Sequence, residues 1–531
     1  MKINIKRVLC ILIVGIFLVS TNVMAINIKN ADDKQENTIM QDNYTSLLSY
    51  GIDYKITFTV KEIRGLDKID LFGEPDFYVK LFVNGEVFTS PVFYNKNYIE
   101  DAWEIEVDVP DDSDNVSIKI QLWDWNIGKD KLCDISDNTA IRISEQYDID
   151  LVYDLKLGHW RGDDFLRPYY NISFDPSGYG RLNGCDDNSI YENDRDCEIW
   201  FDITQNDIDG DNIPEWVEEN VYGTDPTIDN TGWDNDSDGV PIEWEHKWGH
   251  YFGYNWNTQE YTNNWIYSPL KWEDHYVLDP DKDGLQNIEE YYTSEWFSDP
   301  FRKDLFVELD QMEISEGRGA YVPDLSKELL QDAFSRHNIV YHIDDGCMGG
   351  GELIPFKEEV TREELQDIYF RYFLHNDTDN WRRGTFHYGL VIYKCEHWSA
   401  FAFDTRFNNE TRFDSYMLHT ISHEVNPFTP FWYWTLRRHS IDKEYHRSVA
   451  YAGINMHELG HTLGIYNGNT PGCDDRQSPF PGIEWLKYRN YKSCMNYNYV
   501  YSIVDYSDGS RGKNDFDDWQ TIDLTLFQRE R

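Results

Sequence analysis

The feature that most constrains this chain is a twelve-residue acidic pattern that occurs three times between residues 206 and 300. Each copy has Asp at positions 1, 3 and 5 and Glu at position 12. Alternate residues of such a loop can direct their oxygens to one point, and a bidentate Glu can close the far side, as Ca²⁺ requires. The copies are D-I-D-G-D-N-I-P-E-W-V-E from residue 207, D-N-D-S-D-G-V-P-I-E-W-E from residue 234 and D-P-D-K-D-G-L-Q-N-I-E-E from residue 279.

The pattern predicts four calcium ligands in each loop. They are Asp207, Asp209, Asp211, Glu218, Asp234, Asp236, Asp238, Glu245, Asp279, Asp281, Asp283 and Glu290. Position 6 needs a sharp turn, which Gly239 and Gly284 supply, and the first loop has Asn212, which tolerates a left-handed conformation. The runs Y-G-T-D-P and T-S-E-W-F-S-D-P follow the first and third loops. With these runs, residues 206–300 resemble the thrombospondin type 3 calcium repeats of secreted microbial proteins. The resemblance implies about three or more structural calcium ions.

The chain is strongly acidic, with a formal net charge of −48. This charge argues against nucleic acid or an anionic membrane surface as a partner, because both are polyanions. A halophile's solvated surface is one explanation of the acidity, and carboxylates gathered to hold cations are the other. The concentration of acidic residues in the three loops favours the second.

The first 25 residues have the pattern of a secretory signal. Basic residues precede an apolar run from residue 8 to residue 20, and T-N-V-M-A follows. The run is short for a membrane span. We therefore expect cleavage after Ala25 and a secreted, extracellular or cell-surface protein, with an uncleaved anchor as the alternative. Residues 26–50 are polar and predict a linker or a pro-segment.

Export permits disulfide bonds, and seven cysteines follow the signal. Sequence does not determine how cysteines pair. Our preferred pairs are close in the sequence: Cys185–Cys197, Cys473–Cys494 and, as a further candidate, Cys347–Cys395. Cys133 is then left without a partner.

Residues 51–150 alternate between apolar and polar side chains. The runs Y-K-I-T-F-T-V, D-F-Y-V-K-L-F-V, W-E-I-E-V-D-V and V-S-I-K-I-Q-L-W are separated by turn residues, which predicts an antiparallel β-sandwich. Residues 151–205 are expected to be an ordered connecting region, held by a disulfide bond if Cys185 and Cys197 pair.

Two acidic stretches of this sandwich resemble calcium loops of a C2 domain. They are G-L-D-K-I-D-L-F-G-E-P-D-F-Y-V-K-L and L-W-D-W-N-I-G-K-D, residues 122–130. The resemblance implies calcium ligands at Asp70, Asp76, Asp124 and Asp130. Asn126 stands where the pattern usually has an aspartate, and a β-sandwich whose loops are merely acidic is the alternative.

Residues 301–531 mix strand and helix patterns and predict an α+β domain. K-D-L-F-V-E-L-D and R-G-T-F-H-Y-G-L-V-I-Y are typical of strands. K-E-L-L-Q-D-A-F and T-R-E-E-L-Q-D-I-Y-F-R-Y-F are typical of helices, and Thr361 with Glu364 forms a capping box at the start of the second.

The run H-E-L-G-H, residues 457–461, lies in a further predicted helix. His457 and His461 are four residues apart and so lie on one face, where both imidazoles can bind a single Zn²⁺. Glu458 would stand beside a water held at that ion, in the position of a general base.

Two further features give this domain its resemblance to metzincin zinc peptidases. Gly464 follows the second histidine where the chain must leave the helix, and S-C-M-N-Y, residues 493–497, lies downstream. In metzincins a methionine turn lies under the zinc, and a tyrosine two residues later can assist the transition state. The resemblance implies these roles for Met495 and Tyr497.

The sequence departs from the metzincin pattern at the third zinc ligand, where it has Asn467. An amide oxygen is neutral and binds zinc more weakly than imidazole or carboxylate. Asn467 could bind through its oxygen, or Asp474 or Asp475 could replace it if the loop folds back, or the site is degenerate. Glu484 is a more distant candidate.

We therefore expect a secreted, calcium-stabilised zinc endopeptidase that hydrolyses proteins or peptides with metal-activated water and one zinc ion. The alternative is a non-catalytic, calcium-dependent surface or adhesion protein with a degenerate peptidase domain. Asn467 and the extent of the acidic modules motivate the alternative.

Overall fold

The structure is a computed structural model in which the residues from Leu47 to Arg531 form one compact unit. The predicted signal and most of the predicted linker lie outside the described residues. The described residues are 46–70, 73–136, 147–163, 174–176, 178–185, 195–255, 260–396, 400–408, 410–420, 443–474 and 483–528.

The first part is an antiparallel β-sandwich, as predicted. One sheet has the strand order β10-β11-β1-β4, and the other has the order β3-β2-β5-β7-β8, with β6 paired to β5. Apolar side chains of β1, β2 and β5 meet in one core because every second residue of these strands faces inward. The strands are β1 (Lys55–Gly65), β2 (Phe77–Val83), β3 (Glu86–Thr89), β4 (Tyr98–Asp108), β5 (Asn115–Asp124), β6 (Lys131–Leu132), β7 (Ile149–Asp154), β8 (His159–Gly162), β10 (Gly180–Asn183) and β11 (Cys197–Gln205).

The sandwich extends into the region that we expected to connect domains. Strand β11 pairs with β1 from Gln205 opposite Ile56 to Cys197 opposite Gly65. Strand β10 continues that sheet on the other side of β11. Strands β10 and β11 therefore belong to the sandwich. The sequence did not predict this, because loops interrupt the alternation of apolar and polar residues after residue 150.

The predicted disulfide bonds are not formed in the structure. Cysteines 133, 185, 197, 347, 395, 473 and 494 all carry thiols rather than disulfide bonds. The contact partner of the Cys197 thiol is Cys133, with which it shares a hydrogen bond, rather than Cys185. The reason is the pairing of β11 with β1, which carries Cys197 into the sandwich core, where Cys133 is also fully buried.

The second part contains the three acidic loops, each followed by a short helix. The residue at position 7 of each loop, Ile213, Val240 or Leu285, is buried and anchors the loop to a hydrophobic core. A small sheet of order β13-β12-β9 also lies in this part. The elements are α2 (Glu215–Val217), the turn η2 (Glu218–Tyr222), α3 (Ile242–Gly249), α4 (Asn287–Tyr292), the turn η3 (Ser294–Trp296), β9 (Phe174–Pro176), β12 (His250–Asn255) and β13 (Glu260–Trp265).

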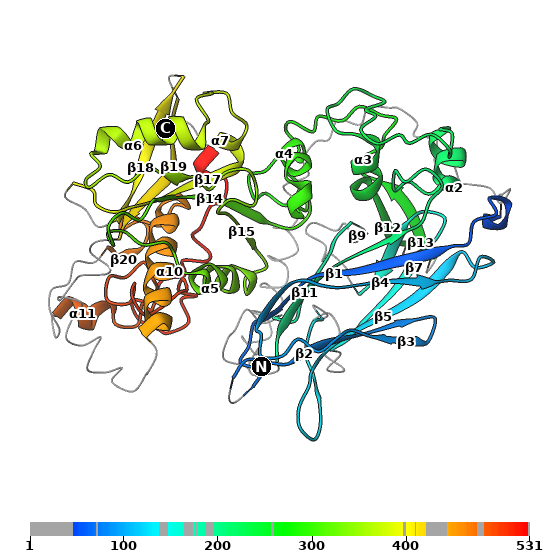
Figure 1. Ribbon diagram of the computed structural model, residues 1–531, viewed down its shortest axis with the longest axis horizontal. Coiled ribbons are helices and arrows are strands. Elements are labelled where there is room, and N and C mark those ends of the chain that lie inside the picture. Colours follow the sequence, from blue (N-terminus) through cyan, green and yellow to red (C-terminus); the bar gives the residue numbers. More distant parts are fainter. Residues whose placement is uncertain are drawn as a thin grey trace, which may run out of the picture. The chain divides into compact units, whose positions relative to one another are not determined.

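The third part is built on a sheet of order β15-β14-β17-β19-β18, with β16 paired to β14 (Figure 1). Strands β14, β15, β16, β17 and β19 run parallel, and the edge strand β18 runs antiparallel to β19. The strands are β14 (Asp304–Met312), β15 (Val340–Asp344), β16 (Leu353–Ile354), β17 (Phe386–Ile392), β18 (Ala400–Phe407) and β19 (Glu410–His419).

Helices cover both faces of this sheet because the side chains of β14 alternate between two cores. Leu305, Val307 and Leu309 pack with α5 and α10, whereas Phe306 packs with α6. The helices and turns are α5 (Asp324–Ser335), α6 (Arg362–Ile368), η4 (Tyr369–Phe373), α7 (Arg382–Thr385), α10 (Lys443–Thr462), α11 (Ile483–Tyr488) and η5 (Leu526–Gln528).

Local sequence signals in this part are confirmed. The predicted strands correspond to β14 and β17, and the predicted helices correspond to α5, α6 and α10. The capping box of Thr361 and Glu364 is formed at the start of α6. No helix among the described residues is long and apolar enough to cross a membrane.

Candidate metal centres

Helix α10 presents His457 and His461 on one face, with both Nδ1 atoms already in use. The Nδ1 atom of His457 lies 2.9 Å from the carbonyl oxygen of Cys494, and that of His461 lies 2.8 Å from the carbonyl oxygen of Ile465. A carbonyl oxygen can only accept, so each Nδ1 carries the proton. The Nε2 atoms are thereby turned away from the backbone and toward Asp474, and an ion at this place would replace the proton that each shares with Asp474.

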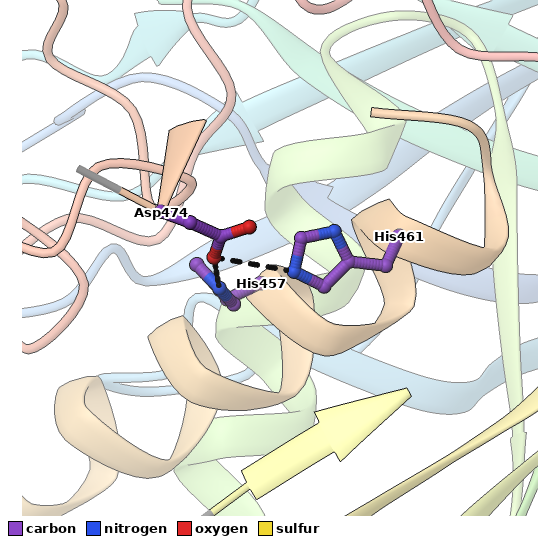
Figure 2. Close-up of side chains that lie close together, drawn as sticks. All are labelled: His457, His461 and Asp474. Carbon is purple, nitrogen blue, oxygen red and sulfur yellow. Dashed lines mark hydrogen bonds and ion pairs between the residues drawn. The ribbon is translucent and has the colours of Figure 1, made fainter. Parts of the chain in front are cut away.

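Asp474 places its carboxylate between the two Nε2 atoms (Figure 2). Its Oδ1 atom lies 3.2 Å from Nε2 of His457 and 3.5 Å from Nε2 of His461. Two ligands of a tetrahedral zinc ion with bonds near 2.05 Å are about 3.3 Å apart. Asp474 therefore lies from each histidine at about the separation that a shared ion would require, and the chemistry of the three side chains fits zinc.

The ionisation of these groups follows from their proximity. Burial alone would raise the pKa of Asp474, but the hydrogen bonds and charges of His457 and His461 hold it well below its usual range. Burial lowers the pKa of His461, yet the hydrogen bond to Asp474 and the charges of Glu458 and Asp474 raise it to about 9. A carboxylate that stays ionised beside two imidazoles is a ready cation ligand.

Asn467, the candidate from the metzincin pattern, makes a different contact. The Nδ2 atom of Asn467 donates a hydrogen bond of 2.9 Å to the carbonyl oxygen of Cys473, and the residue is exposed. Its amide thus ties together the loop that carries Asp474. Asp475 and the side chain of Glu484 lie outside the described residues.

Gly464 ends helix α10, as predicted. Its φ of 95° is in the left-handed region, and the N–H of Ile465 donates to the carbonyl oxygen of Gly460 at 2.8 Å. Glycine adopts this conformation without strain, so it is suited to closing a helix. The turn leads the chain back toward Asp474.

The turn around Met495 lies beneath the helix. The side chain of Met495 is fully buried, and a Cβ atom added to Gly460 would lie 2.5 Å from its sulfur. The backbone of the same turn holds two members of the site. Cys494 accepts from His457, and the carbonyl oxygen of Met495 accepts the N–H of Asp474 at 3.1 Å.

Glu458 and Tyr497 flank the three candidate ligands. Burial raises the pKa of Glu458, while His457 and His461 act in the opposite direction, and its carboxylate accepts the backbone N–H of Ala402 in β18. The ring of Tyr497 stacks on His457 with ring centroids 5.2 Å apart. Burial, followed by the charge of Asp474 and a hydrogen bond to it, raises the pKa of Tyr497.

The three acidic loops share one backbone geometry, which is clearest in the second. Asp234 at position 1 accepts the N–H of Ser237 at 2.6 Å and of Gly239 at 3.1 Å, and both donors have positive φ. The left-handed conformation that we predicted for Asn212 is confirmed by its φ of 65°. The same two bonds recur in the other loops: to Asp207 from Gly210 and Asn212, and to Asp279 from Lys282 and Gly284.

Positions 3 and 12 of every loop hold buried carboxylate oxygens that have no hydrogen-bond partner. These atoms are both oxygens of Asp209 with Oε2 of Glu218, both oxygens of Asp236 with Oε1 of Glu245, and Oδ2 of Asp281 with Oε1 of Glu290. Burying a carboxylate without a partner is costly, so such groups are normally paired or bind a metal. The donor set consists of hard oxygens and therefore fits Ca²⁺.

The electrostatics of the loops point the same way. Burial, and then the neighbouring aspartates, raise the pKa of Glu218 to about 8 and that of Glu245 to about 10. The pKa of Glu290 is raised well above its ordinary value for the same two reasons. Nearby positive charge would reverse these shifts, because it favours the ionised form.

A lysine lies among the predicted ligands of the sandwich. The ammonium group of Lys131 is 2.6 Å from Oδ1 of Asp70 and 3.1 Å from Oδ2 of Asp124, whose side chain is fully buried. Asp130 instead accepts from the hydroxyl of Tyr78 at 2.8 Å. Asp76 accepts the N–H of Asn95 at 2.7 Å.

Lys131 thus supplies positive charge between two of the four predicted calcium ligands. It lies seven residues after Asp124 in the sequence, but the pairing of β6 with β5 brings the two together. Calcium binding by this group of aspartates stays a prediction, in which an ion would compete with a tethered ammonium.

Comparisons with known proteins bear on the sandwich. Residues 54–151 match the family model of the C2 domain. These residues form a C2 domain. The C2 domain begins at the first residues of the predicted sandwich, and the match ends before β10 and β11. A comparison of the chain with curated proteins gives no match.

Solved structures that resemble the chain include other C2 domains. One described as a C2 domain is 15% identical, with a TM-score of 0.17 over 29% of this chain and 97% of that one. A C2 domain of a plant extended synaptotagmin 1 is 15% identical, with a TM-score of 0.18 over 28% of this chain and 94% of that one. Human GIVD cytosolic phospholipase A2 is 15% identical, with a TM-score of 0.17 over 28% of this chain and 16% of that one.

Proposed function

We propose that the chain is a calcium-stabilised zinc endopeptidase of the metzincin type that acts outside the cell. The observation that carries the proposal is the position of Asp474, whose Oδ1 atom lies 3.2 Å and 3.5 Å from the Nε2 atoms of His457 and His461. A zinc site on a helix with H-E-x-x-H needs a third protein ligand, and Asp474 offers a charged one. This weighs against the alternative of a degenerate peptidase domain, which was motivated by Asn467.

When bound, a zinc ion at these three side chains would act as a Lewis acid, acidifying water and polarising the carbonyl of a peptide bond. Glu458 follows His457 directly and is 5% exposed, so its carboxylate is shielded from bulk water. In the proposed reaction the oxygen of water bonds to the carbonyl carbon while Glu458 takes the proton of that water. The C–N bond then breaks, and Glu458 gives the proton to the leaving amine.

Tyr497 is placed to stabilise the negative charge that develops on the substrate oxygen. Its ring is fixed against His457, yet the residue is 43% exposed, so its hydroxyl can meet a substrate. That hydroxyl also forms a hydrogen bond with Asp474. A phenol whose pKa is raised stays protonated and can donate a hydrogen bond to an oxyanion.

The edge strand β18 suggests how an extended substrate would bind. Strand β18 pairs with β19 on one side, and the backbone N–H of its Ala402 donates to Glu458. An edge strand can hydrogen-bond to a peptide that lies along it as an additional strand. Such a peptide would lie beside the proposed general base.

The test compares peptide hydrolysis and zinc content of the wild type and Glu458→Gln. We expect the variant to keep its zinc, because Glu458 is not a ligand, and to lose about 10²- to 10⁴-fold in kcat, which is the usual contribution of a general base. The matched control is Glu444→Gln on an exposed turn of the same helix, which should act like the wild type. Equal kcat for the wild type and Glu458→Gln would contradict the mechanism.

The three loops are proposed to be calcium-binding repeats of the thrombospondin type 3 kind. Their support is the set of buried oxygens without partners at positions 3 and 12. Extracellular fluid is rich in calcium, and loops that need the ion for their stability suit a protein that acts there.

A further inference from the structure

The second acidic loop differs from the other two in the segment that packs against it. In every loop the aspartate at position 5 accepts a backbone N–H from a later segment. The donor to Asp211 is Asn230, at 3.1 Å, and the donor to Asp283 is Asp304, at 2.7 Å. The donor to Asp238 is Glu273, at 3.2 Å, and this contact brings His275 to the loop.

Four side chains from two segments converge at this place. Asp238, Glu245, Glu273 and His275 each offer a ligand atom, and these atoms all lie within 4.8 Å of one another. The Nε2 atom of His275 is 3.1 Å from Oδ2 of Asp238 and 4.0 Å from Oε1 of Glu245. Asp238, Glu245 and His275 are buried, with at most 3% of each residue exposed.

Several of these atoms have no hydrogen-bond partner. By strict hydrogen-bond geometry, the buried atoms Oε1 of Glu245, Oε2 of Glu273 and Nε2 of His275 have no partner, although Nε2 lies 3.1 Å from Oδ2 of Asp238 and interacts with it. A fully buried imidazole nitrogen that faces three carboxylates is an independent sign of a cation ligand, because imidazole nitrogen is a common donor to metals.

The side-chain amide of Asn287 lies beside the other ring nitrogen of His275. Its Nδ2 atom lies 2.9 Å from Nδ1 of His275, while its own Oδ1 atom is buried without a partner. The oxygen and nitrogen of such an amide are nearly alike in shape. Turning the amide would let Oδ1 accept a proton held by Nδ1, which satisfies both groups and leaves a lone pair on Nε2.

The third loop provides an internal comparison because a histidine also lies near it. Nε2 of His342 is hydrogen-bonded to Oδ1 of Asp304 at 2.6 Å, and Asp304 also pairs with Arg181 at 3.0 Å. That nitrogen is therefore in use and is not offered to the loop. In the second loop, by contrast, an imidazole nitrogen faces the carboxylates of the loop itself.

We propose that Asp238, Glu245, Glu273 and His275 form a site for a zinc-class transition ion, distinct from the catalytic centre. Ca²⁺ takes oxygen ligands, whereas Zn²⁺ binds imidazole and carboxylate together at about 2.0–2.2 Å. Asp234 and Asp236 remain with the calcium loop alone, whereas Asp238 and Glu245, which we also predict as calcium ligands, are shared between the two sites. An ion here would fasten the second loop to the segment that precedes the third, since His275 also contacts Asn287 at position 9 of that loop.

The test uses the full mature chain with both catalytic histidines replaced, as His457→Ala/His461→Ala, so that the proposed peptidase site cannot hold zinc. The protein is equilibrated with millimolar calcium and micromolar zinc, and its bound metals are counted by mass spectrometry. We expect one zinc per chain. Adding His275→Gln should weaken that binding by at least about 100-fold, because a direct ligand matters no less than the outer partners whose loss costs 10- to 100-fold.

Asp209→Asn in the same background is the matched control. It alters the equivalent acidic cluster of the first loop, which among the described residues consists of three aspartates, and should leave the zinc in place while calcium binding weakens. Zinc that survives His275→Gln would overturn the proposal, as would a catalytic-site variant that binds no zinc under these conditions.

Anomalous diffraction from wild-type crystals at the zinc absorption edge gives a second measurement that does not depend on variants. A peak beside Nε2 of His275 is expected, and its absence from zinc-soaked crystals would overturn the proposal. A zinc peak at His275 but not at His457 would support this site and contradict the proposed peptidase. A zinc peak at His457 but not at His275 would contradict this site and leave the proposed peptidase unaffected.

Discussion

Removal of calcium should destabilise the acidic loops in a strongly pH-dependent way, and Glu245 shows why. In the calcium-free fold its pKa is raised from 4.5 to about 10 by burial and by the neighbouring aspartates. Below about pH 4.5 the carboxyl is protonated in both the folded and the unfolded chain, so it has no effect. Between that pH and about pH 10 only the unfolded chain releases the proton, which favours unfolding by about 1.4 kcal/mol per pH unit.

The magnitude at two assay conditions follows directly. About pH 7.5 lies three units above 4.5, so Glu245 alone would destabilise the calcium-free fold by about 4 kcal/mol. At about pH 5.5, Glu245 would destabilise the calcium-free fold by only about 1.4 kcal/mol. Since a domain is stable by about 5–15 kcal/mol, the first value is a large share of the total and the second is not.

Thermal unfolding followed by tryptophan fluorescence can measure this, because Trp216 and Trp244 are buried in the helices after the first and second loops. The calcium-loaded and calcium-depleted chains are compared without added zinc, because an ion at the site proposed above would itself keep Glu245 ionised. We expect Tm to fall by about 8–16 °C at about pH 7.5 and by about 3–6 °C at about pH 5.5, at 2–4 °C per kcal/mol. In Glu245→Gln, the decreases in Tm at the two pH values should be closer to each other than in the wild type.

Two results would refute the reasoning. One is a calcium-depleted protein whose Tm at about pH 7.5 equals that of the loaded protein. The other is a decrease in Tm on calcium removal that is as large at about pH 5.5 as it is at about pH 7.5. Either would mean that the buried carboxylates do not repel one another in the way their contacts indicate.

Three further predictions, which use four substitutions, test other parts of the structure. Asp474→Ala should lower the affinity for zinc at the proposed site of His457 and His461 by at least about 10-fold, whereas Asn467→Ala should keep most of that affinity, as measured by competition with a chromogenic chelator. Equal losses in the two variants would contradict the assignment of the third ligand. Lys131→Gln should expose the carboxylates of the C2 domain to calcium and raise its calcium affinity, as measured by calorimetry; an unchanged affinity would show that the lysine does not compete with the ion. Gly460→Ala should destabilise the fold by about 1–3 kcal/mol in chemical denaturation, because the new methyl group would overlap the sulfur of Met495. A variant as stable as the wild type would mean that the methionine turn is not packed against the helix.

The features that were predictable from sequence are those set by residues close together in the chain. The loop geometry is one example, since Asp234 bonds to backbone groups three and five residues later. The capping box at Thr361 and the helix that carries H-E-L-G-H are others. In each case the period and the local hydrogen bonds determine the structure before any tertiary contact forms.

The features that were not predictable depend on contacts between distant segments. Asp474 could be named only as one of several candidates, because its place beside His457 depends on the backbone bond from its N–H to Met495. His275 gave no sequence signal at all, since it lies outside the twelve-residue pattern. Glu273, in the same short segment, is the residue whose N–H bonds to Asp238 and so brings the histidine into the site.

The third loop packs directly against the sheet of residues 301–531, across the boundary predicted between the calcium repeats and the peptidase domain. Its Leu285 packs in the same core as Phe306 of β14 and Phe386 of β17. Its Asp283 accepts the N–H of Asp304, the first residue of β14, at 2.7 Å. The first strand of this sheet therefore begins with a residue whose backbone N–H is held by a carboxylate of the loop.

Residues near the C-terminus, Thr525 and Gln528, also connect the third loop to this sheet. The side-chain amide of Gln528 donates to the carbonyl oxygens of Gly284 in the loop and Gly384 before β17. A Cβ atom on Gly284 would lie 3.1 Å from the backbone of Thr525, so the turn of the loop and the C-terminal segment are in close contact. Strands β14 and β17 are neighbours in the sheet, and β17 pairs with β19, whose other neighbour β18 contacts Glu458. Loss of calcium from the third loop should therefore disturb the sheet that supports the proposed active site, whereas the first loop is anchored instead in the core of the sandwich through Ile213.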